Sequence, residues 1–311
     1  MPLAQSFIGI DISQAFLDIF DDASARHSRI ANDEASIADF AAAAAVRSVT
    51  VIFEATGSYD RRLAAGLDAA KVSYVRVNPA RARDFARAAG RLAKTDALDA
   101  RVLAAMGRAI DLKPAEPGDP ARQRLAALHK RRDQLVEQRA DEKKRALQTS
   151  EPLARESIEN HIRWLKTEIS TLDRAIADCV AASQDISDAK TLLETVPGVG
   201  PVTAITLIAQ MPELGRLNAK AIAALAGLAP FNNDSGAMRG KRTIKGGRRR
   251  VRRALYRAAI SAIRSCEKFR TRYQEILKRS AKPKIAIIAI ARKLLVTLNA
   301  MAKSKQAFKY I

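Results

Sequence analysis

Four carboxylates in the first third of the chain have positions suited to binding a divalent cation. Asp11 lies within the apolar run FIGIDIS, Glu54 follows the apolar run VIF, and Asp96 and Asp99 are three residues apart in a helical pattern. A charge within an apolar strand is costly unless something compensates it, and carboxylate oxygens are ligands that suit Mg²⁺. A pair of such ions can hold the attacking and leaving oxygens of a phosphodiester. We therefore predict a two-metal Mg²⁺ site at these four acids.

Simpler interpretations of the helical pair stay open. Asp96 alone could favour a helix start through the helix dipole. Asp99 could be a surface charge paired with Lys94 or Arg101. Three further acids, Asp18, Asp21 and Asp22, belong to a predicted edge hairpin, where we expect them to face solvent.

A second candidate for chemistry is Ser235, in the stretch NNDSGAMRGKRTIKGGRRR at 232–250. A serine hydroxyl is a poor nucleophile unless a base or a metal activates it, and no histidine lies nearby in the sequence. The cations around it favour a nucleic-acid strand, because each neutralised phosphate adds salt-dependent affinity. The predicted nucleic-acid-binding residues are Arg239, Lys241, Arg242, Lys245, Arg248, Arg249, Arg250, Arg252 and Arg253. The alternative is a solvated basic loop in which the serine is incidental.

The segment VPGVGPVTA at 196–204 resembles a helix-hairpin-helix. Glycines such as Gly198 and Gly200 let the backbone turn tightly, so that amide groups and a helix N-terminus face a phosphate without reading bases. The same letters also fit a plain turn between two helices.

Charge is distributed unevenly along the 311 residues, whose net charge is +21. Segment 239–293 holds 20 Lys and Arg against 2 Asp and Glu, whereas segment 1–60 holds 3 against 9. This asymmetry predicts a polyanionic partner for the C-terminal part. Cys179 and Cys266 share no motif, no signal peptide is recognisable, and the apolar run 285–291 is too short to span a bilayer. We expect a soluble, cytoplasmic protein with no membrane partner.

The order of predicted elements positions the four acids. Strands are predicted at 7–13, 15–21, 27–33, 48–56 and 72–78, and helices at 34–46, 60–71, 79–90 and 95–109. Three strands followed by alternating helices and strands indicate an α/β domain with a mixed sheet over 1–112, in the ribonuclease H-like order. In that order the first and fourth strands are neighbours, and the last helix adds its acids to the same end.

The rest of the chain is predicted to be helical. Residues 113–187 comprise a proline-rich linker and two long helices, 121–148 and the helix after Pro152. The second has a heptad seam of Ile158, Ile162, Leu165, Ile169, Leu172, Ile176 and Cys179. An antiparallel hairpin, an intermolecular coiled coil and an ordinary bundle helix all fit it. Residues 188–311 form a helical domain that contains the PGVG hairpin and Ser235.

These motifs together resemble the DEDD-type insertion-sequence transposases of the "one-ten" class, the bridge-RNA-guided recombinases. The matching stretches are GIDIS, FEATGSY, KTDALDA, VPGVGP and LAGLAPFNNDSGAMRGKRTIKGGR, which occur in family order. The resemblance implies a RuvC-like domain in which Asp11, Glu54, Asp96 and Asp99 coordinate Mg²⁺. It also implies that Ser235 forms a 5′-phosphoserine link with DNA.

The same resemblance implies the partners of the protein. A noncoding bridge RNA pairs with donor and target DNA, and the enzyme acts as a homo-oligomer, a dimer or tetramer, with a composite active site. The expected location is the bacterial cytoplasm, in association with the nucleoid. Two other functions remain open: a RuvC-like Mg²⁺-dependent nuclease or junction resolvase that uses water, and a non-catalytic nucleic-acid-binding protein.

Overall fold

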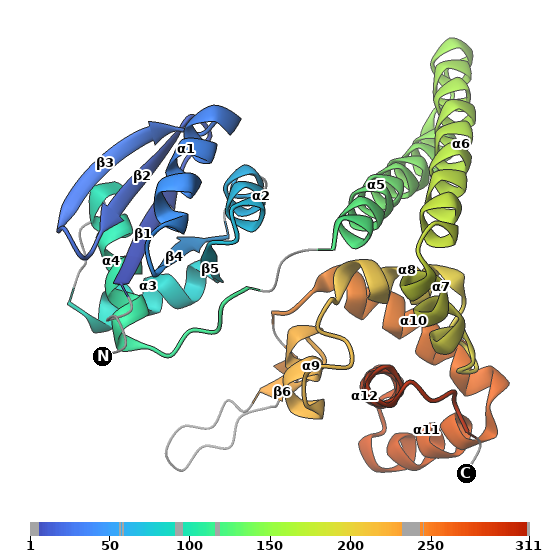
Figure 1. The fold of residues 1–311 in the computed structure, drawn as a ribbon. Coiled ribbons are helices and arrows are strands. Elements are labelled where there is room, and N and C mark those ends of the chain that lie inside the picture. Colours follow the sequence, from blue (N-terminus) through green and yellow to red (C-terminus); the bar gives the residue numbers. More distant parts are fainter. Residues whose placement is uncertain are drawn as a thin grey trace. The chain divides into compact units, whose positions relative to one another are not determined.

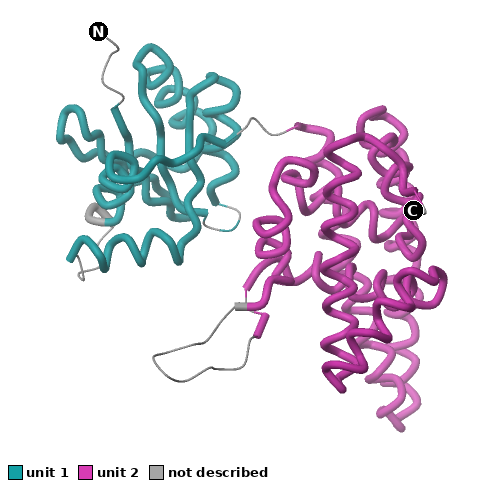
Figure 2. Tube along the Cα trace, turned by 90° about the horizontal axis from the view of Figure 1, so that it is seen from below, with its two compact units in different colours: residues 1–118 teal, residues 119–311 magenta. Residues whose placement is uncertain are grey.

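The computed structural model describes residues 6–55, 57, 59–90, 96–115, 119–231, 243–244 and 246–309. The chain divides into two compact units, Met1–Gly118 and Asp119–Ile311, which are coloured separately in Figure 2. Each unit has its own hydrophobic core, so we describe them one after the other.

A mixed sheet of five strands forms the centre of the first unit (Figure 1). The strands are β1 (Ser6–Ile12), β2 (Phe16–Asp21), β3 (Arg26–Ala31), β4 (Val49–Glu54) and β5 (Ser73–Val77). They lie in the order β3-β2-β1-β4-β5, with β4 parallel to both β1 and β5, and β2 antiparallel to β1 and β3. The predicted mixed sheet, and the predicted neighbourhood of the first and fourth strands, are therefore confirmed.

Helices cover both faces of this sheet. α1 (Glu34–Ala45) and α2 (Arg61–Ala69) bury Ile37 and Leu63 against one face, together with Ile8 and Ile10 of β1. α3 (Pro79–Ala88) and α4 (Asp96–Ala109) cover the other face, where Leu103 packs with Ile52 of β4. Because side chains alternate along a strand, Phe7, Gly9 and Asp11 lie on the α4 face of β1.

Two glycines allow α4 to lie unusually close to the sheet. A Cβ at Gly9 would overlap the carbonyl oxygen of Ala100 and would lie 2.6 Å from the amide nitrogen of Ala104. One at Gly107 would collide with the side chains of Ile52 and Phe7. The helix therefore runs antiparallel to β1, with its later turns beside Phe7 and its earlier turns beside Gly9.

The second unit begins with a helical hairpin. α5 (Pro120–Gln148) and α6 (Pro152–Ala181) lie side by side in opposite directions (Figure 1). Leu135 of α5 is buried against Leu165 and Ile169 of α6, so the heptad seam faces the first helix of the hairpin. Near the far end, by contrast, Leu147 and Leu153 are 89% and 74% exposed.

The remaining elements form an all-helical core apart from two short strands. They are α7 (Gln184–Glu194), α8 (Pro201–Gln210), α9 (Ala219–Leu225), β6 (Pro230–Phe231), β7 (Thr243–Ile244), α10 (Arg249–Ser265), α11 (Glu267–Ser280) and α12 (Pro283–Ser304). By length and composition alone, α12 is apolar enough to cross a membrane, the only such helix in the described part of the chain. Its Leu294, Leu295 and Leu298 are fully buried among the other helices, so its apolar face contributes to the core.

The tight contact at Gly9 yields a prediction about stability. Replacing Gly9 with alanine forces α4 away from β1, because the clash is with backbone atoms that cannot rotate aside. Overpacking of this kind costs about 1–3 kcal/mol, which corresponds to exchange about 5- to 150-fold faster for amides that open with the unit. Hydrogen exchange of peptides from β1 and α4 measures it.

Gly200→Ala provides the control for this substitution. Nothing lies within 4 Å of a Cβ at Gly200, whose φ of −96° suits any residue. Equal exchange rates for Gly9→Ala and the parent protein in β1 and α4 would contradict the packing argument.

Candidate active site

Three of the four predicted acids occupy one corner of the first unit. In the parallel pair of β1 and β4, Ile10 lies beside Phe53, so Asp11 and Glu54 are the next residues along neighbouring strands. Ile52 faces α4 at Gly107, and Glu54, two residues later, faces the same side. α4 runs antiparallel to β1, and its Ala100 lies beside Gly9. The turn before Ala100, which contains Asp99, therefore lies towards Asp11. The fold thus brings the backbone of these positions together.

The side chains at this corner are accessible without being fully exposed. Asp11, Glu54 and Asp99 are all half-buried. Asp96 is the first residue of α4, but its side chain lies outside the described part of the structure. Within the described part, no three His, Cys, Asp or Glu side chains are grouped closely enough to hold a metal ion. The corner supplies oxygen donors of the type that Mg²⁺ prefers, from separate elements that a cation would draw together.

Sequence reasoning missed a pair of buried polar residues that fix the segments beside these acids. The side-chain amide of Asn32 donates to the carbonyl oxygens of Ser13 and Tyr59, at 2.8 and 3.2 Å. Ser13 follows the strand of Asp11, and Tyr59 follows the strand of Glu54. Asn32 is 5% exposed, so these bonds are shielded from water. One buried amide therefore holds together the two segments that leave the acidic strands.

Asp60 is the second missed residue. Its side chain is fully buried, and its Oδ2 accepts from Nε and Nη2 of Arg76 on β5, at 3.0 and 2.5 Å. Its Oδ1 has no hydrogen-bond partner in the described part of the chain. The letters FEATGSYD give no signal for this, because the partner of Asp60 comes from the next strand.

The expectation for Asp18, Asp21 and Asp22 was wrong. Each carboxylate is paired with an arginine and is largely covered, with side-chain exposures of 15%, 18% and 14%. Their partners are Arg29 on β3, Arg47 after α1, and Arg108 on α4. Hydrogen bonds from Arg47 hold the pKa of Asp21 below its ordinary value. Asp18 is covered by its register partner on the neighbouring strand, whereas Asp21 and Asp22 are covered by arginines that follow α1 and lie on α4.

The two glycines of the PGVG hairpin have different surroundings. Gly198, with φ +89°, packs on α10, where a Cβ would overlap the backbone of Ala262. This glycine therefore allows close approach of two parts of the protein. Gly200 is exposed, caps α8, and has nothing within 4 Å of a Cβ. Of the two positions, only Gly200 presents open backbone beside the α8 N-terminus.

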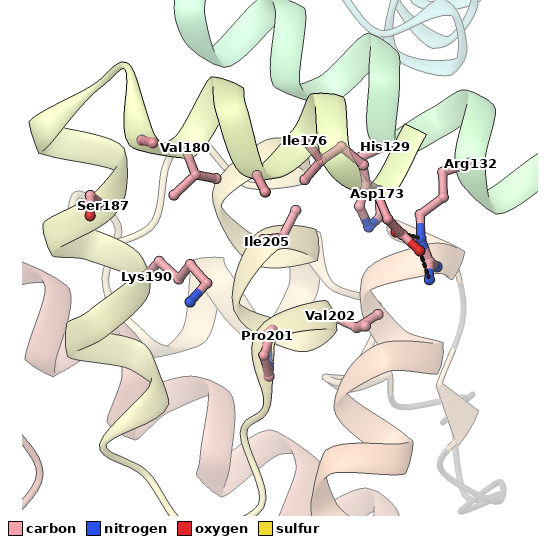
Figure 3. A pocket seen from close by; sticks show the side chains of 12 residues that line it. His129, Arg132, Asp173, Ile176, Val180, Ser187, Lys190, Pro201, Val202 and Ile205 are labelled. Carbon is pink, nitrogen blue, oxygen red and sulfur yellow. Dashed lines mark hydrogen bonds and ion pairs between the residues drawn. The ribbon is translucent and has the colours of Figure 1, made fainter. Parts of the chain in front are cut away.

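A pocket of about 420 Å³ lies beside the start of α8 (Figure 3). Its walls are Pro201, Val202 and Ile205 of α8, apolar residues of α6, and the paired side chains of Arg132 and Asp173. Burial lowers the pKa of His129, and its Nε2 is 3.1 Å from the hydroxyl of Thr206. The pocket is mainly apolar, so it does not by itself form an anion site.

The arginines at the start of α10 make contacts within the protein. Arg248 forms a double hydrogen bond with Glu213, at 2.6 and 2.7 Å. Burial raises the pKa of Glu213, but the hydrogen bonds and charge of Arg248, a backbone hydrogen bond and the charge of Arg216 together leave the pKa below its ordinary value. Arg253 binds Glu137 of α5 at 2.5 Å.

Two further arginines of α10 also have internal partners. Arg250 lies 4.0 Å from Asp133 of α5. Arg252 donates to two backbone carbonyls. Arg249, in contrast, is exposed. Four of the five arginines predicted to bind nucleic acid at 248–253 thus also connect α10 to the rest of the unit.

The other predicted basic ligands and the serine cannot be placed. Ser235, Arg239, Lys241, Arg242 and Lys245 lie outside the described residues. Their assignment continues to rest on the sequence. The two ends of this segment are described, at β6 and β7.

Known families match two long parts of the chain. Residues 8–149 match a DEDD-type family of insertion-sequence transposases described as "Transposase". Residues 190–274 match the "Transposase IS116/IS110/IS902 family". The first match contains all four predicted acids, and the second contains Ser235 and the arginines of α10.

Individual relatives agree with these matches. The chain is 29% identical over 269 residues to the "Pilin gene-inverting protein" of Moraxella bovis, covering 83% of this chain and 81% of that protein. The corresponding protein of Moraxella lacunata gives the same figures. A Streptomyces coelicolor protein named "Insertion element IS110 uncharacterized 43.6 kDa protein" is 27% identical over 139 residues, 44% of this chain and 34% of its own length. The chain therefore belongs to the IS110 family of transposases, enzymes that act on DNA by phosphoryl transfer.

Proposed function

We propose that this transposase cuts and rejoins DNA strands with Ser235 as the nucleophile and with Mg²⁺ held by Asp11, Glu54, Asp96 and Asp99. The observation that carries the proposal is the convergence of β1, β4 and the first turn of α4 at one corner of the sheet. The DEDD-type domain of this family implies metal-dependent catalysis. Two bound ions would neutralise charge on the scissile phosphate and lower the pKa of the attacking hydroxyl.

The fold supports the same proposal. The strand order β3-β2-β1-β4-β5, with β2 antiparallel to its neighbours, is the order expected for a ribonuclease H-like or RuvC-like domain, which we assign to residues 1–112. We assign residues 113–187 to a coiled-coil-like hairpin that supports assembly. We assign residues 188–311 to the domain that carries Ser235, and α8 with the part of α7 from residue 188 onwards to its helix-hairpin-helix.

The proposed chemical step conserves the energy of the phosphodiester. The Ser235 hydroxyl loses its proton as its oxygen attacks phosphorus, and the bond to the 3′ oxygen of the preceding nucleotide breaks. The products are a 5′-phosphoserine and a free 3′-hydroxyl, which takes up a proton. Attack by another 3′-hydroxyl on the phosphoserine reverses the step and joins new strands, so no ATP is needed.

The basic residues around Ser235 have a separate role in this proposal. Lys241, Arg242 and Lys245 offset negative charge that develops on the phosphate. The arginines of α10 hold the helix against Glu213, Asp133 and Glu137, and Arg249 extends the cationic surface. DNA is the partner that a transposase requires. A bridge RNA that pairs with donor and target DNA is part of our proposal, as is action at the bacterial nucleoid.

The hairpin supports a homo-oligomer. Leu147 and Leu153 are apolar and exposed near its far end, and Trp164 of α6 is 50% exposed. Apolar side chains of this size favour a protein contact over water. We propose that subunits associate and that the acidic corner of one works with Ser235 of another.

The covalent step makes the first prediction. Ser235→Ala removes the attacking oxygen, so the covalent protein–DNA adduct disappears and strand exchange falls at least about 1,000-fold. Denaturing gels with labelled junction DNA from the parent insertion element measure the adduct. Ser265→Ala, an exposed serine of α10, is the control and leaves the adduct intact. Strand cleavage that persists in Ser235→Ala without an adduct would instead support a water-dependent nuclease.

The acidic corner makes the second prediction. Asp11→Asn keeps the size of the side chain but removes its charge, so strand cleavage falls about 100- to 1,000-fold while DNA affinity is retained. Removing divalent metal with a chelator gives the same pattern. Asp84→Asn, at an exposed site on α3, leaves the rate unchanged. If Asp11→Asn cleaves DNA at the parent rate, the corner is not catalytic and the proposal fails.

The composite site makes the third prediction. Neither Ser235→Ala nor Asp11→Asn exchanges strands alone, but a mixture regains activity if one subunit supplies the serine and another the acids. Equimolar mixing after brief dissociation, followed by the adduct assay, measures this recovery. A mixture as inactive as each variant alone, with mixed oligomers demonstrated by size, would place both halves in one subunit.

A further inference from the structure

The two ends of the segment that carries Ser235 are fastened to each other and to α10. β6 and β7 pair antiparallel, with Pro230 opposite Ile244 and Phe231 opposite Thr243. A ladder of two residues per strand is too short to be stable alone. Other contacts must therefore hold these ends in place.

Gly227 and Gly247 provide the first such contact. Both have a φ of +69°, a conformation that favours glycine. A Cβ at Gly247 would overlap the backbone nitrogen of Gly227, so the chain before β6 and the chain after β7 touch at the backbone. Gly246 has a similar φ of +60°, but nothing lies within 4 Å of its Cβ position.

Arg252 provides the second contact. Its Nη1 donates to the carbonyl oxygen of Gly246 at 2.7 Å and to that of Gly227 at 3.3 Å. One guanidinium thus bridges the two ends of the segment. Its helix is fixed in turn, because Val251 and Leu255 are fully buried in the core.

The neighbouring arginine secures the same junction. The backbone amide of Arg248 donates to Leu225 at the end of α9, at 2.9 Å, and its side chain binds Glu213. Leu228 and Ala229, just before β6, donate to the carbonyl of Ala223 in α9. The first end is therefore joined to α9, and the second to α10.

We propose that Arg252, with Gly227 and Gly247, forms a clasp that positions the Ser235 segment for attack. We define the clasp as these three residues. The inference rests on the proposed function, since it gives these three residues the task of orienting the nucleophile. Arg252 is a positioning residue, because its guanidinium donates hydrogen bonds to backbone carbonyls of the protein. Misplacement of a nucleophile by about 1 Å costs about 100-fold in rate, so a loose clasp slows attack without weakening DNA binding.

Two substitutions break the clasp in different ways. Arg252→Met removes the bridge, and Gly247→Ala forces the two ends apart while Arg252 is kept. In the full-length protein with saturating junction DNA, both lower the single-turnover rate of adduct formation about 10- to 100-fold. Their dissociation constants for the DNA, measured by fluorescence anisotropy, stay within about 2-fold of the parent.

Two matched variants distinguish loss of the clasp from the effects of backbone strain and of lost charge. Gly246→Ala introduces the same kind of backbone strain without the clash and keeps the carbonyl that Arg252 binds, so its adduct rate falls less than that of Gly247→Ala. Arg252→Lys keeps the charge and one donor, and recovers part of the rate. Hydrogen exchange at residues 243–247 is faster in Arg252→Met and Gly247→Ala, whereas exchange in α12 is unchanged.

A cross-link provides a rescue. Pro230 and Ile244 are partners across the ladder. Pro230→Cys with Ile244→Cys forms a disulfide on oxidation that replaces the clasp and raises the adduct rate of Arg252→Met. Parent rates in both Arg252→Met and Gly247→Ala overturn the inference but leave Ser235 as nucleophile. Loss of DNA affinity with an unchanged rate in Arg252→Met would make Arg252 a phosphate ligand and also overturns it. Absence of any adduct in the parent protein removes the proposed function itself.

Discussion

The close contact of α4 with β1 is the constraint on which the acidic corner depends. Gly9 has no side chain, and the backbone of Ala100 occupies the space that a Cβ would take. This approach brings the first turn of α4 to the end of the sheet where Asp11 and Glu54 lie on neighbouring strands. Packing of Leu103 against Ile52, and of Gly9 against the backbone of Ala100, holds the helix on the sheet. A cation bound at this corner, as we propose, would join residues of the strands and the helix, so it would also stabilise the packing of α4 on β1.

In the second unit, contacts within the protein likewise determine where the charged residues lie. The arginine run has the composition of a phosphate-binding surface, yet Arg248, Arg250, Arg252 and Arg253 all contact the protein. Their charge is partly balanced by Glu213, Asp133 and Glu137. This balance keeps α10 in place beside the hairpin of α5 and α6, and the helix fixes the ends of the Ser235 segment. Arginines that hold the scaffold thus alternate in one stretch with the exposed Arg249.

Much of the first unit could be predicted from sequence because its signals are local. The apolar runs around Asp11 and Glu54 marked buried strands, and the order of elements made those strands neighbours. Asp60, Asn32 and Asp18 could not be found in this way, because their partners Arg76, Ser13 and Arg29 lie on other elements. Charge counting likewise identified the basic stretch but not its internal partners. The glycines of PGVG and KGGRRR show the same limit, because only the fold reveals that Gly198 and Gly247 approach other parts of the protein.

The central claim is that the corner formed by β1, β4 and α4 holds the catalytic metal. Anomalous diffraction from crystals of the protein with Mn²⁺ and DNA tests it most directly. The account predicts anomalous peaks within coordination distance of Asp11, Glu54, Asp96 and Asp99. Peaks confined to other carboxylates, such as those of Asp18 or Asp60, with none at this corner, would contradict it.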